Sequence, residues 1–274
     1  MAEEPGVELA KMTSPQAAAA LAAAEVAIVP VGATEQHGPN LSLETDTAIA
    51  DALARRIAAA VFPRAVVTPP LPFGVSHHHL RFPGTLTLSP DTFQAVLLDL
   101  AESLRRHGVP RLFVVDGHAG NQGALDVLMT KLRFERGIPA AYLFPFAIAG
   151  DAIREGVGSE RWGHACEVEA SLGLALRPEI VHAESLEAGA ILPPLLPFAD
   201  PRQPHRIAAP LWFDEITANG ALGDARRASS GFGESVASTV VARAVAFLER
   251  FVELEPGDDR WPEAGPPSAA WGNG

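Results

Sequence analysis

The sequence contains a single cysteine, Cys166, among its 274 residues. One cysteine cannot form an intrachain disulfide, and it also excludes the zinc sites that are built from paired cysteines. Low cysteine use is typical of proteins that work in a reducing compartment. We therefore expect a cytoplasmic protein whose stability comes from a hydrophobic core, which a chain of this length can bury without crosslinks.

Basic residues are also scarce, because 21 Lys and Arg stand against 33 Asp and Glu, which gives a formal net charge of −12. Such a surface repels phosphate backbones, so nucleic acid is not an expected partner. No stretch of about 18 apolar residues lacks a charge, so no membrane span is expected. Glu3, Glu4 and Glu8 stand where a secretory signal needs positive charge, so we expect an unprocessed chain.

Several familiar catalytic motifs are missing. The chain has no Gly-x-Ser-x-Gly elbow, so serine-hydrolase chemistry is not supported. It has no His-Glu-x-x-His helix, and neither a Gly-x-Gly-x-x-Gly loop nor a Walker sequence. What it does have is 9 histidines and a set of carboxylates beside short apolar segments.

Short apolar segments alternate with longer helical patterns along most of the chain. Strands are expected at 26–32, 65–68, 111–117 and 140–147, and helices at 14–24, 46–60, 89–107, 121–136, 168–176 and 234–254. This alternation predicts a three-layer α/β/α fold with a mostly parallel central sheet. We expect one domain over 14–254, flexible termini at 1–13 and 255–274, and a loop-rich segment at 180–233.

In a parallel sheet, ligands bind beyond the carboxyl ends of the strands. Glu35 and His37 follow the first strand, and in an extended loop two such residues project the same way. Asp46 could join them from the start of the next helix. A carboxylate and imidazole set suits zinc, manganese or iron rather than calcium. An equally favoured alternative is that Asp46 caps the helix, Glu35 is an ordinary loop residue and His37 is exposed.

Two further segments carry candidate residues. His118 lies between Gly117 and Gly120 at the end of the third strand, where it either faces a ligand or fills the turn. Glu169 lies in an apolar helix, where a buried carboxylate requires a cation or hydrogen-bond donors; stabilisation of the helix dipole is the alternative. Cys166 is interpreted as a packing residue.

The loop after the second strand contains three consecutive histidines, at 77–79. Their side chains alternate in direction along an extended chain, so they cannot all bind one metal ion. At least one is expected to be exposed and one to face the substrate. Trp162, Trp212 and Phe213 could line a pocket, although aromatic residues of this kind are more often found in cores.

Four blocks of the sequence resemble the creatininase (creatinine amidohydrolase) family. They are Val-Pro-Val-Gly-Ala-Thr-Glu-Gln-His-Gly-Pro at 29–39 with Asp46, His-Leu-Arg-Phe-Pro-Gly-Thr at 79–85, Gly-His-Ala-Gly-Asn at 117–121, and His164 followed by Glu-Ala-Ser at 169–171. Their order and spacing fit the family over roughly residues 15–250.

The resemblance implies one α/β/α domain with two divalent ions at the strand ends, zinc before manganese or iron. The implied ligands are Glu35, His37, Asp46, His118 and Glu169, with Asp46 bridging the two ions. His164 is implied to be the catalytic histidine. The resemblance also implies a homo-oligomer, a hexamer. We expect substrate contacts from His79, Arg81, Gly117, Gly120 and Trp162.

The expected reaction is metal-dependent hydrolysis of an amide bond in a small molecule, namely a cyclic amide, a formamide or a short peptide. Two ions would lower the pKa of a water from 15.7 to roughly 7 and so provide hydroxide, and His164 would pass a proton to the leaving nitrogen. A mycofactocin-type peptidase, a non-catalytic ligand-binding relative and a phosphate-binding α/β domain are the alternatives. Creatininase carries a glutamate where this chain has Gly120, which argues against creatinine as the substrate.

Overall fold

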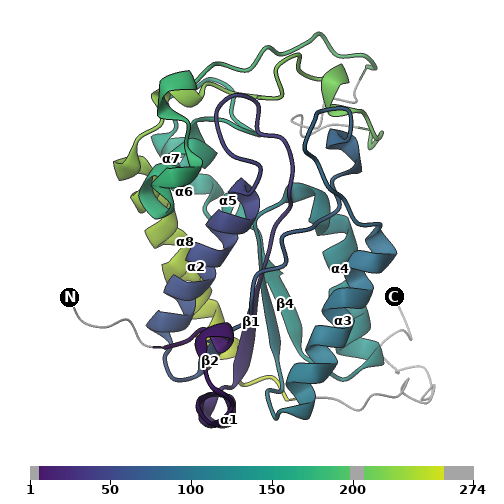
Figure 1. Ribbon diagram of the computed structural model, residues 1–274, viewed down its shortest axis with the longest axis vertical. Coiled ribbons are helices and arrows are strands. Elements are labelled where there is room, and N and C mark those ends of the chain that lie inside the picture. Colours follow the sequence, from purple (N-terminus) through teal and green to yellow (C-terminus); the bar gives the residue numbers. More distant parts are fainter. Residues whose placement is uncertain (1–5, 198–206, 256–274) are drawn as a thin grey trace, which may run out of the picture.

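A computed structural model describes residues 6–197 and 207–255 of the chain (Figure 1). Its central sheet has four strands in the order β2-β1-β3-β4, and every neighbouring pair is parallel. The strands are β1 (Val26–Val31), β2 (Ala65–Val67), β3 (Leu112–Asp116) and β4 (Ala140–Leu143). The parallel sheet that the sequence predicts is therefore confirmed.

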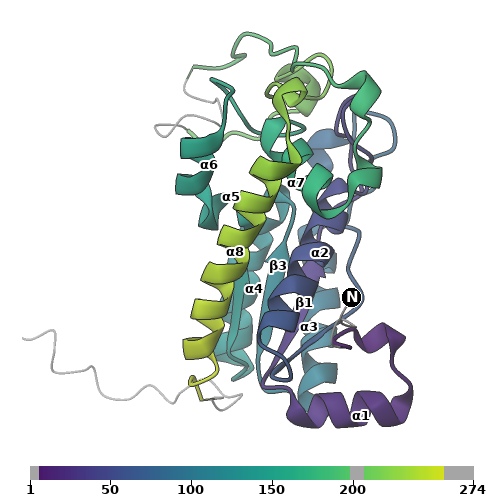
Figure 2. The same ribbon diagram turned by 90° about the vertical axis from the view of Figure 1, so that its left-hand side faces the viewer.

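Helices cover both faces of this sheet (Figures 1 and 2). One face is covered by α2 (Thr45–Ala60), α5 (Pro145–Ile148), α6 (Gly150–Gly156), α7 (Glu167–Leu176) and α8 (Ser230–Phe251). The other face is covered by α3 (Pro90–Arg106) and by α4 (Gln122–Thr130), which a π-helical turn at Lys131–Glu135 continues. Helix α1 (Ser14–Ala23) lies at the β2 edge of the molecule.

The side chains of β1 are divided between two hydrophobic cores. Ile28 belongs to the core that contains α2 and α8, whereas Val29 belongs to the core that contains α3 and α4. Successive side chains of a strand point to opposite faces, so a strand that is buried on both faces is apolar throughout. All six residues of β1 are buried, which confirms the three-layer α/β/α architecture.

The fourth strand is shorter than the sequence predicts. It ends at Leu143, and α5 begins at Pro145. Proline has no N–H for the strand ladder, and its fixed φ suits the first turn of a helix. The expectation of a strand over 140–147 is therefore wrong beyond 143, and residues 144–148 lie instead at the end of the sheet where ligands bind.

The N-terminal segment also differs from its expectation. Val7 is buried, and its carbonyl accepts a hydrogen bond of 2.8 Å from the N–H of Val67 in the edge strand β2. A flexible terminus over 1–13 is therefore wrong for the residues from Val7 to Lys11, because the free edge of β2 gives this segment a partner. Residues 1–5 and the predicted tail beyond Glu255 lie outside the described residues.

Helix α8 is long and apolar enough to cross a membrane by length and composition alone. Val236, Val240 and Leu248 on this helix are buried in the core, where α8 packs on α7 and α2. A third of the apolar window of α8 is buried in this way, so length and composition alone are weak evidence for a membrane span. Up to Ser229, the described residues of the predicted loop-rich segment at 180–233 form short 3-10 turns and isolated β-bridges, and no α-helix or named strand.

Shortening a core side chain of α2 should destabilise the protein. Leu53 is fully buried between α2 and the sheet, so Leu53→Ala is expected to lower the free energy of unfolding by about 2–5 kcal/mol. Val127 on α4 is 48% exposed, so Val127→Ala should change it by less than about 0.5 kcal/mol. Urea unfolding followed by circular dichroism measures both, and equal losses would contradict this core assignment.

Candidate metal centre

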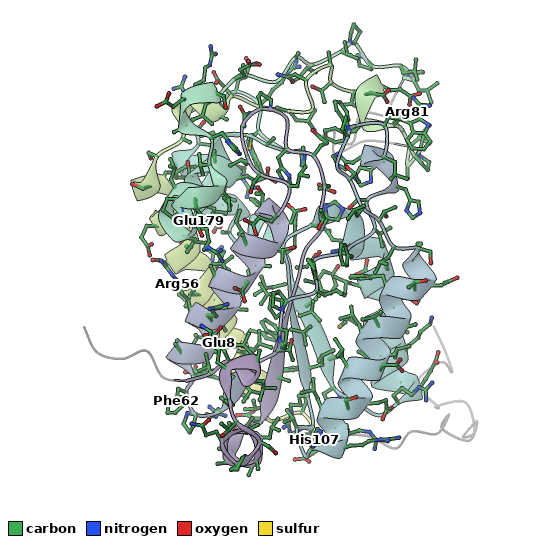
Figure 3. All side chains as sticks on the ribbon, in the orientation of Figure 1. Glu8, Arg56, Phe62, Arg81, His107 and Glu179 are labelled. Atoms are coloured by element: carbon green, nitrogen blue, oxygen red, sulfur yellow. The ribbon has the colours of Figure 1, made fainter. Side chains whose placement is uncertain are left out.

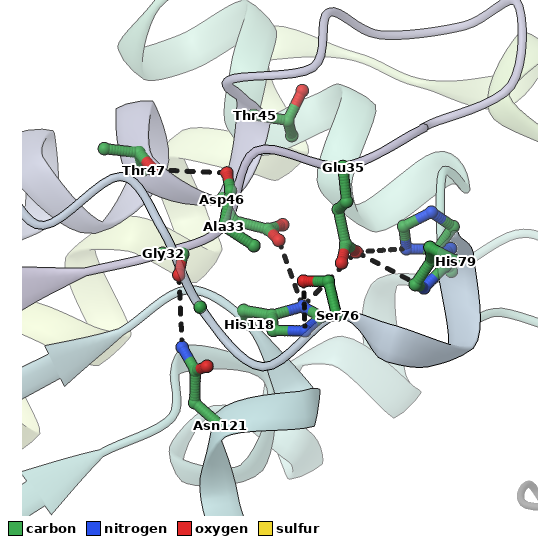
Figure 4. A network of polar contacts seen from close by, with 12 residues as sticks. Gly32, Ala33, Glu35, Thr45, Asp46, Thr47, Ser76, His79, His118 and Asn121 are labelled. Carbon is green, nitrogen blue, oxygen red and sulfur yellow. Dashed lines mark hydrogen bonds and ion pairs between the residues drawn. The ribbon is translucent and has the colours of Figure 1, made fainter. Parts of the chain in front are cut away.

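Five of the predicted site residues come from four separate segments at one end of the sheet. Glu35 and His37 lie in the loop after β1, Asp46 in the first turn of α2, His118 in the loop after β3, and Glu169 in the first turn of α7. All five are buried. Figure 4 shows the side chains of Glu35, Asp46 and His118 directed toward one another.

Asp46 lies at the centre of this cluster. Its Oδ1 is 3.2 Å from Nε2 of His37, and its Oδ2 is 3.1 Å from Nδ1 of His118. On the His118 side, Oε1 of Glu35 is 3.3 Å from the same Nδ1. On the His37 side, Oε2 of Glu169 is 3.9 Å from Nε2 of His37. The cluster therefore has two lobes that share Asp46.

Two glycines allow Asp46 to reach this position. A Cβ at Gly32 would lie 2.4 Å from the backbone N of Thr47, and a Cβ at Gly117 would lie 2.1 Å from the carbonyl oxygen of Asp46. Any larger residue at either position would push the first turn of α2 away from the ends of β1 and β3. The backbone of Asp46 thus occupies the space that a side chain at position 117 would need.

Backbone carbonyls orient the two ligand-type imidazoles. Nδ1 of His37 lies 3.1 Å from the carbonyl oxygen of Glu35, and Nε2 of His118 lies 3.2 Å from the carbonyl oxygen of Val75. A carbonyl can only accept, so these nitrogens carry the protons. The other nitrogen of each ring then faces the carboxylates, where it can hold a proton in the metal-free chain or bind a metal ion in place of that proton, as metal-binding histidines do.

Glu169 is held in place by its own loop. The N–H of Ala165, whose φ of +52° lies in the left-handed region, donates a hydrogen bond to Oε2 of Glu169. Burial raises the pKa of Glu169 to about 8, although the nearby His37 lowers it. The interpretation of Glu169 as a carboxylate that requires a cation or donors fits this environment.

The other members of the cluster shift one another's protonation. Burial lowers the pKa of His37, but the carboxylates of Asp46, Glu169 and Glu35 together outweigh burial and raise this pKa to about 9. Burial raises the pKa of Asp46, yet His37 and His118 hold it well below its usual range. The pKa of His118 is raised, against burial, by Glu35 and Asp46. Protons therefore balance the buried carboxylates in the metal-free chain.

The donor set fits divalent cations. Both oxygens of Glu35 are buried, and within the described ranges no donor is aligned to give either one a hydrogen bond, although histidine nitrogens lie 3.3–3.7 Å from Oε1. A buried carboxylate without donors is costly unless a cation is bound to it. Carboxylate oxygens and neutral imidazoles are ligands that zinc and manganese accept.

A cavity of about 470 Å³ opens over the cluster. His164 lines it, with Nδ1 3.7 Å from Oε1 of Glu35, as do His79, Gly117 and Trp162. Ring contacts close its roof, because the centroid of Phe213 lies 4.0 Å from that of His79 and 4.9 Å from that of His164. Three of the five predicted substrate contacts, His79, Gly117 and Trp162, therefore surround one space together with the predicted catalytic residue His164.

Arg81 and Gly120 are absent from the walls of this cavity as far as the described residues define them. The guanidinium of Arg81 pairs with Asp214 at 3.2 Å and Glu215 at 3.5 Å, and it stacks 4.4 Å from the ring centroid of Trp212. Figure 3 shows Arg81 at the end of the molecule opposite to His107. Arg81 thus anchors the 212–215 turn, against its predicted contact with substrate.

Gly120 has a structural reason to be glycine. A Cβ there would lie 2.3 Å from Nε2 of His118 and 2.4 Å from the carbonyl oxygen of Val75. The N–H groups of Gly117 and His118 are engaged by Val31 O and Asp116 Oδ1, at 2.9 and 3.1 Å. These two groups are therefore unavailable to a substrate oxyanion.

Sequence reasoning missed part of the cavity wall. Phe144 and Phe146 line it because β4 ends early, and His78 and Leu222 line it as well. The strand-end rule would have found Phe144 and Phe146 if Pro145 had been interpreted as a helix start. Leu222 follows no sequence pattern, because it lies in the aperiodic segment at 180–233.

The chain matches the family model Creatininase, described as creatinine amidohydrolase, over residues 10–248. The mycofactocin precursor peptide peptidase of Mycobacterium ulcerans (strain Agy99) is 32% identical over 241 residues, or 85% of this chain and 86% of that protein. The creatinine amidohydrolase of Pseudomonas putida is 28% identical over 235 residues, or 79% of this chain and 85% of that protein. The similarity thus covers most of the chain.

Solved structures are similar over the same extent. A manganese form of creatininase has a TM-score of 0.71 and 28% identity, covering 90% of this chain and 99% of that one. A mutant creatininase of the Zn–Zn type has a TM-score of 0.70 and 28% identity, with coverage of 90% and 99%. The fold is therefore one that holds manganese or zinc in other proteins.

Removing the shared carboxylate should abolish metal binding. Asp46→Ala is expected to lower the affinity for zinc and manganese by more than the 10–100-fold that follows from loss of a ligand's hydrogen-bond partner. Elemental analysis after equilibrium dialysis measures the bound metal. Asp51→Ala is the matched control, because Asp51 is buried on the same helix but pairs with Arg55 at 2.7 Å. Equal metal content in both variants would contradict the assignment.

The metal-free protein should lose stability as the pH rises from about 6.5 to 9. The folded state raises the pKa of His37 to about 9 and that of Glu169 to about 8. It therefore holds protons that the unfolded chain has already released, and this stabilisation is lost as the pH rises through these values. Burial lowers the pKa of His79 and of His164, so both are neutral in the folded state. Above about pH 6.5 they are also neutral in the unfolded chain, so they do not change how stability depends on pH in this range.

Urea midpoints in the presence of a chelator at pH 7 and pH 9 measure this effect. Glu169→Gln should reduce the difference, because an amide does not titrate in this range. Saturating zinc should also reduce it, because metal binding favours the deprotonated ligands. A midpoint that increases from pH 7 to pH 9 in chelator would contradict the prediction.

Proposed function

Because the chain belongs to the creatininase family, whose members hydrolyse amide C–N bonds, we propose that it is a metal-dependent amidohydrolase that uses two divalent ions. The observation that carries this proposal is the two-lobed cluster around Asp46, open to a cavity and containing carboxylate oxygens without donors. A non-catalytic relative has no need to retain such a set of buried charges.

His37, Asp46 and Glu169 would hold one ion, and Glu35, Asp46 and His118 the other. Zinc is the first expectation, with manganese or iron as alternatives. When bound, two such ions polarise an amide carbonyl and lower the pKa of a water from 15.7 to roughly 7. The carboxylates and imidazoles of the chain supply the charge and the orientation that this chemistry needs.

His164 is proposed to carry the proton. Its Nε2 donates a hydrogen bond of 2.7 Å to the carbonyl oxygen of Gln36, which holds the ring, while Nδ1 faces the cavity beside Glu35. A neutral imidazole in this position can take a proton from the attacking water and then give it to the leaving nitrogen. The amide bond breaks as that nitrogen gains its proton.

The cavity favours an uncharged, apolar substrate. Its walls include Phe144, Phe146, Leu211 and Ile216, and no lysine or arginine lines it among the residues that the structure places. Away from the metal-binding cluster, a carboxylate or phosphate on the substrate would therefore find no lysine or arginine to pair with. Cyclic amides, formamides and short peptides with apolar side chains fit these walls.

Among amide substrates, a peptide is the second candidate beside a small amide such as a cyclic amide or a formamide. The mycofactocin precursor peptide peptidase is 32% identical to this chain, against 28% for the Pseudomonas putida creatinine amidohydrolase. The absence of a side chain at Gly120 also separates this site from the creatinine site that the family resemblance describes. The two candidates share the metal-binding cluster and differ only in what occupies the cavity.

Three further expectations accompany the proposal and rest on the sequence or the resemblance alone. The single cysteine favours a cytoplasmic location. The family resemblance favours a homo-oligomer, a hexamer. The acidic surface favours partners other than nucleic acid.

Replacing His164 should slow turnover without removing the metal. His164→Ala is expected to lower kcat by about 10²–10⁴-fold, the usual contribution of general acid–base catalysis. The assay uses a panel of cyclic amides, formamides and short peptides with zinc, manganese or iron, and chelation should abolish the activity. His107→Ala is the control, because His107 lies at the opposite end of the molecule. A change in KM alone would assign His164 to substrate binding.

A further inference from the structure

We propose that Gln36, which lies between two ligands of the metal-binding cluster, is a positioning residue that fixes which ring nitrogen of His79 and of His164 carries the proton. Gln36 is buried and does not line the cavity. The chemical consequence of this arrangement rests on the proposed amide hydrolysis, whereas the arrangement itself follows from hydrogen bonds.

Two backbone groups fix the orientation of the Gln36 amide. The N–H of Gly38 donates to Oε1 at 2.9 Å, and Nε2 donates to the carbonyl oxygen of Gly220 at 3.1 Å. An N–H can only donate and a carbonyl can only accept, so the amide cannot be reversed without losing both bonds. One N–H of the amide therefore remains for a third partner.

That third partner is His79. Its Nδ1 lies 2.9 Å from Nε2 of Gln36, so it accepts the remaining N–H and cannot carry a proton itself. The proton of the neutral ring is then on Nε2. This nitrogen lies 3.4 Å from Oε1 of Glu35. The protonated Nε2 of His79 therefore faces the carboxylate of Glu35 without being aligned for a hydrogen bond to it.

The backbone of the same residue determines the state of His164. Its Nε2 lies 2.7 Å from the carbonyl oxygen of Gln36, an atom that can only accept. Nε2 of His164 is therefore protonated, and it cannot also accept from the Gln36 side chain 3.2 Å away. Nδ1, which faces Glu35 at 3.7 Å, has a free lone pair. His164 therefore presents a proton acceptor to the cavity.

Gly220 is shaped to admit the Gln36 side chain. A Cβ at this position would lie 1.9 Å from Oε1 of Gln36, and the φ of Gly220 is +82°. Both the space and the backbone conformation require glycine. The segment that carries Phe213 over the cavity is thereby joined to the loop that carries Glu35 and His37.

The two histidines that flank Glu35 thus have opposite roles. His79 has no free nitrogen and can only donate, so its Nε2–H is available to a substrate oxygen. His164 can accept a proton from water, which is the first half of the proposed transfer. Without a fixed donor at position 36, the imidazole of His79 could adopt either neutral form.

The protonated nitrogens can be observed directly. Long-range ¹H–¹⁵N spectra of histidine-labelled, zinc-loaded protein distinguish the two ring nitrogens, and His79→Gln and His164→Gln assign the signals. Both residues are expected to carry the proton on Nε2 in the wild-type protein. In Gln36→Glu, an acceptor replaces the donor beside His79, so His79 should gain a proton on Nδ1 while His164 is unchanged.

Gln94→Glu is the matched control. Gln94 is another buried glutamine, but its amide donates to the carbonyl oxygen of Ala124 at 2.8 Å, away from the cluster. This variant should leave both histidines unchanged. A proton on Nδ1 of His79 in the wild-type protein would overturn the proposal, whether or not the variants fold. An unaltered His79 in folded Gln36→Glu would overturn it as well.

The spectra separate this inference from the proposed function. The expected proton positions without any amide hydrolysis would leave the role of Gln36 standing and remove the enzymatic proposal. Amide hydrolysis with the proton of His79 on Nδ1 would leave the enzymatic proposal standing and remove the role of Gln36.

Discussion

The close approach of α2 to the ends of β1 and β3 is the constraint on which the site depends. Asp46 reaches both histidine lobes only because Gly32 and Gly117 leave room for the backbone of the first turn of α2. The helix is held there by its buried face, which packs in the same core as Ile28 and Phe113. The packing of α2 against the sheet therefore determines the geometry of the cluster.

This arrangement concentrates negative charge in a buried place. Glu35, Asp46 and Glu169 come together with little access to water, a state that is unfavourable unless protons or cations balance it. In the metal-free chain, protonated His37 and His118 provide that balance. A divalent ion would replace those protons, so metal binding, proton release and stability are coupled in this fold.

The sequence predicts the sheet and the metal-binding cluster well, because both depend on regular features. The strand-end rule places Glu35, His37 and His118 at one edge as soon as the strands are identified, and the structure brings them together with Asp46 and Glu169. The cavity walls are harder to predict. They depend on where β4 stops and on how the aperiodic segment at 180–233 folds back, and tertiary packing rather than local pattern decides both.

Arg81 illustrates a second limit. Its place in a block with His79 suggests a common role, yet a 3-10 turn at His77–His79 directs the chain so that His79 faces Glu35 while Arg81 pairs with Asp214. The sequence gives no signal for that partner, which is more than 130 positions away. The prediction placed Arg81 beside His79 at the substrate, whereas the turn directs the two side chains to different partners.

The roof of the cavity comes from a different stretch of chain than the cluster of proposed metal ligands at its floor. Phe213 and Leu222 belong to the segment between α7 and α8, and Phe144 to the end of β4, whereas no ligand-type residue of the cluster comes from either segment. Substitutions in these two segments can therefore change which substrate fits the cavity without changing the proposed metal ligands. This division of labour offers a physical route by which one scaffold could serve unrelated amides in different organisms.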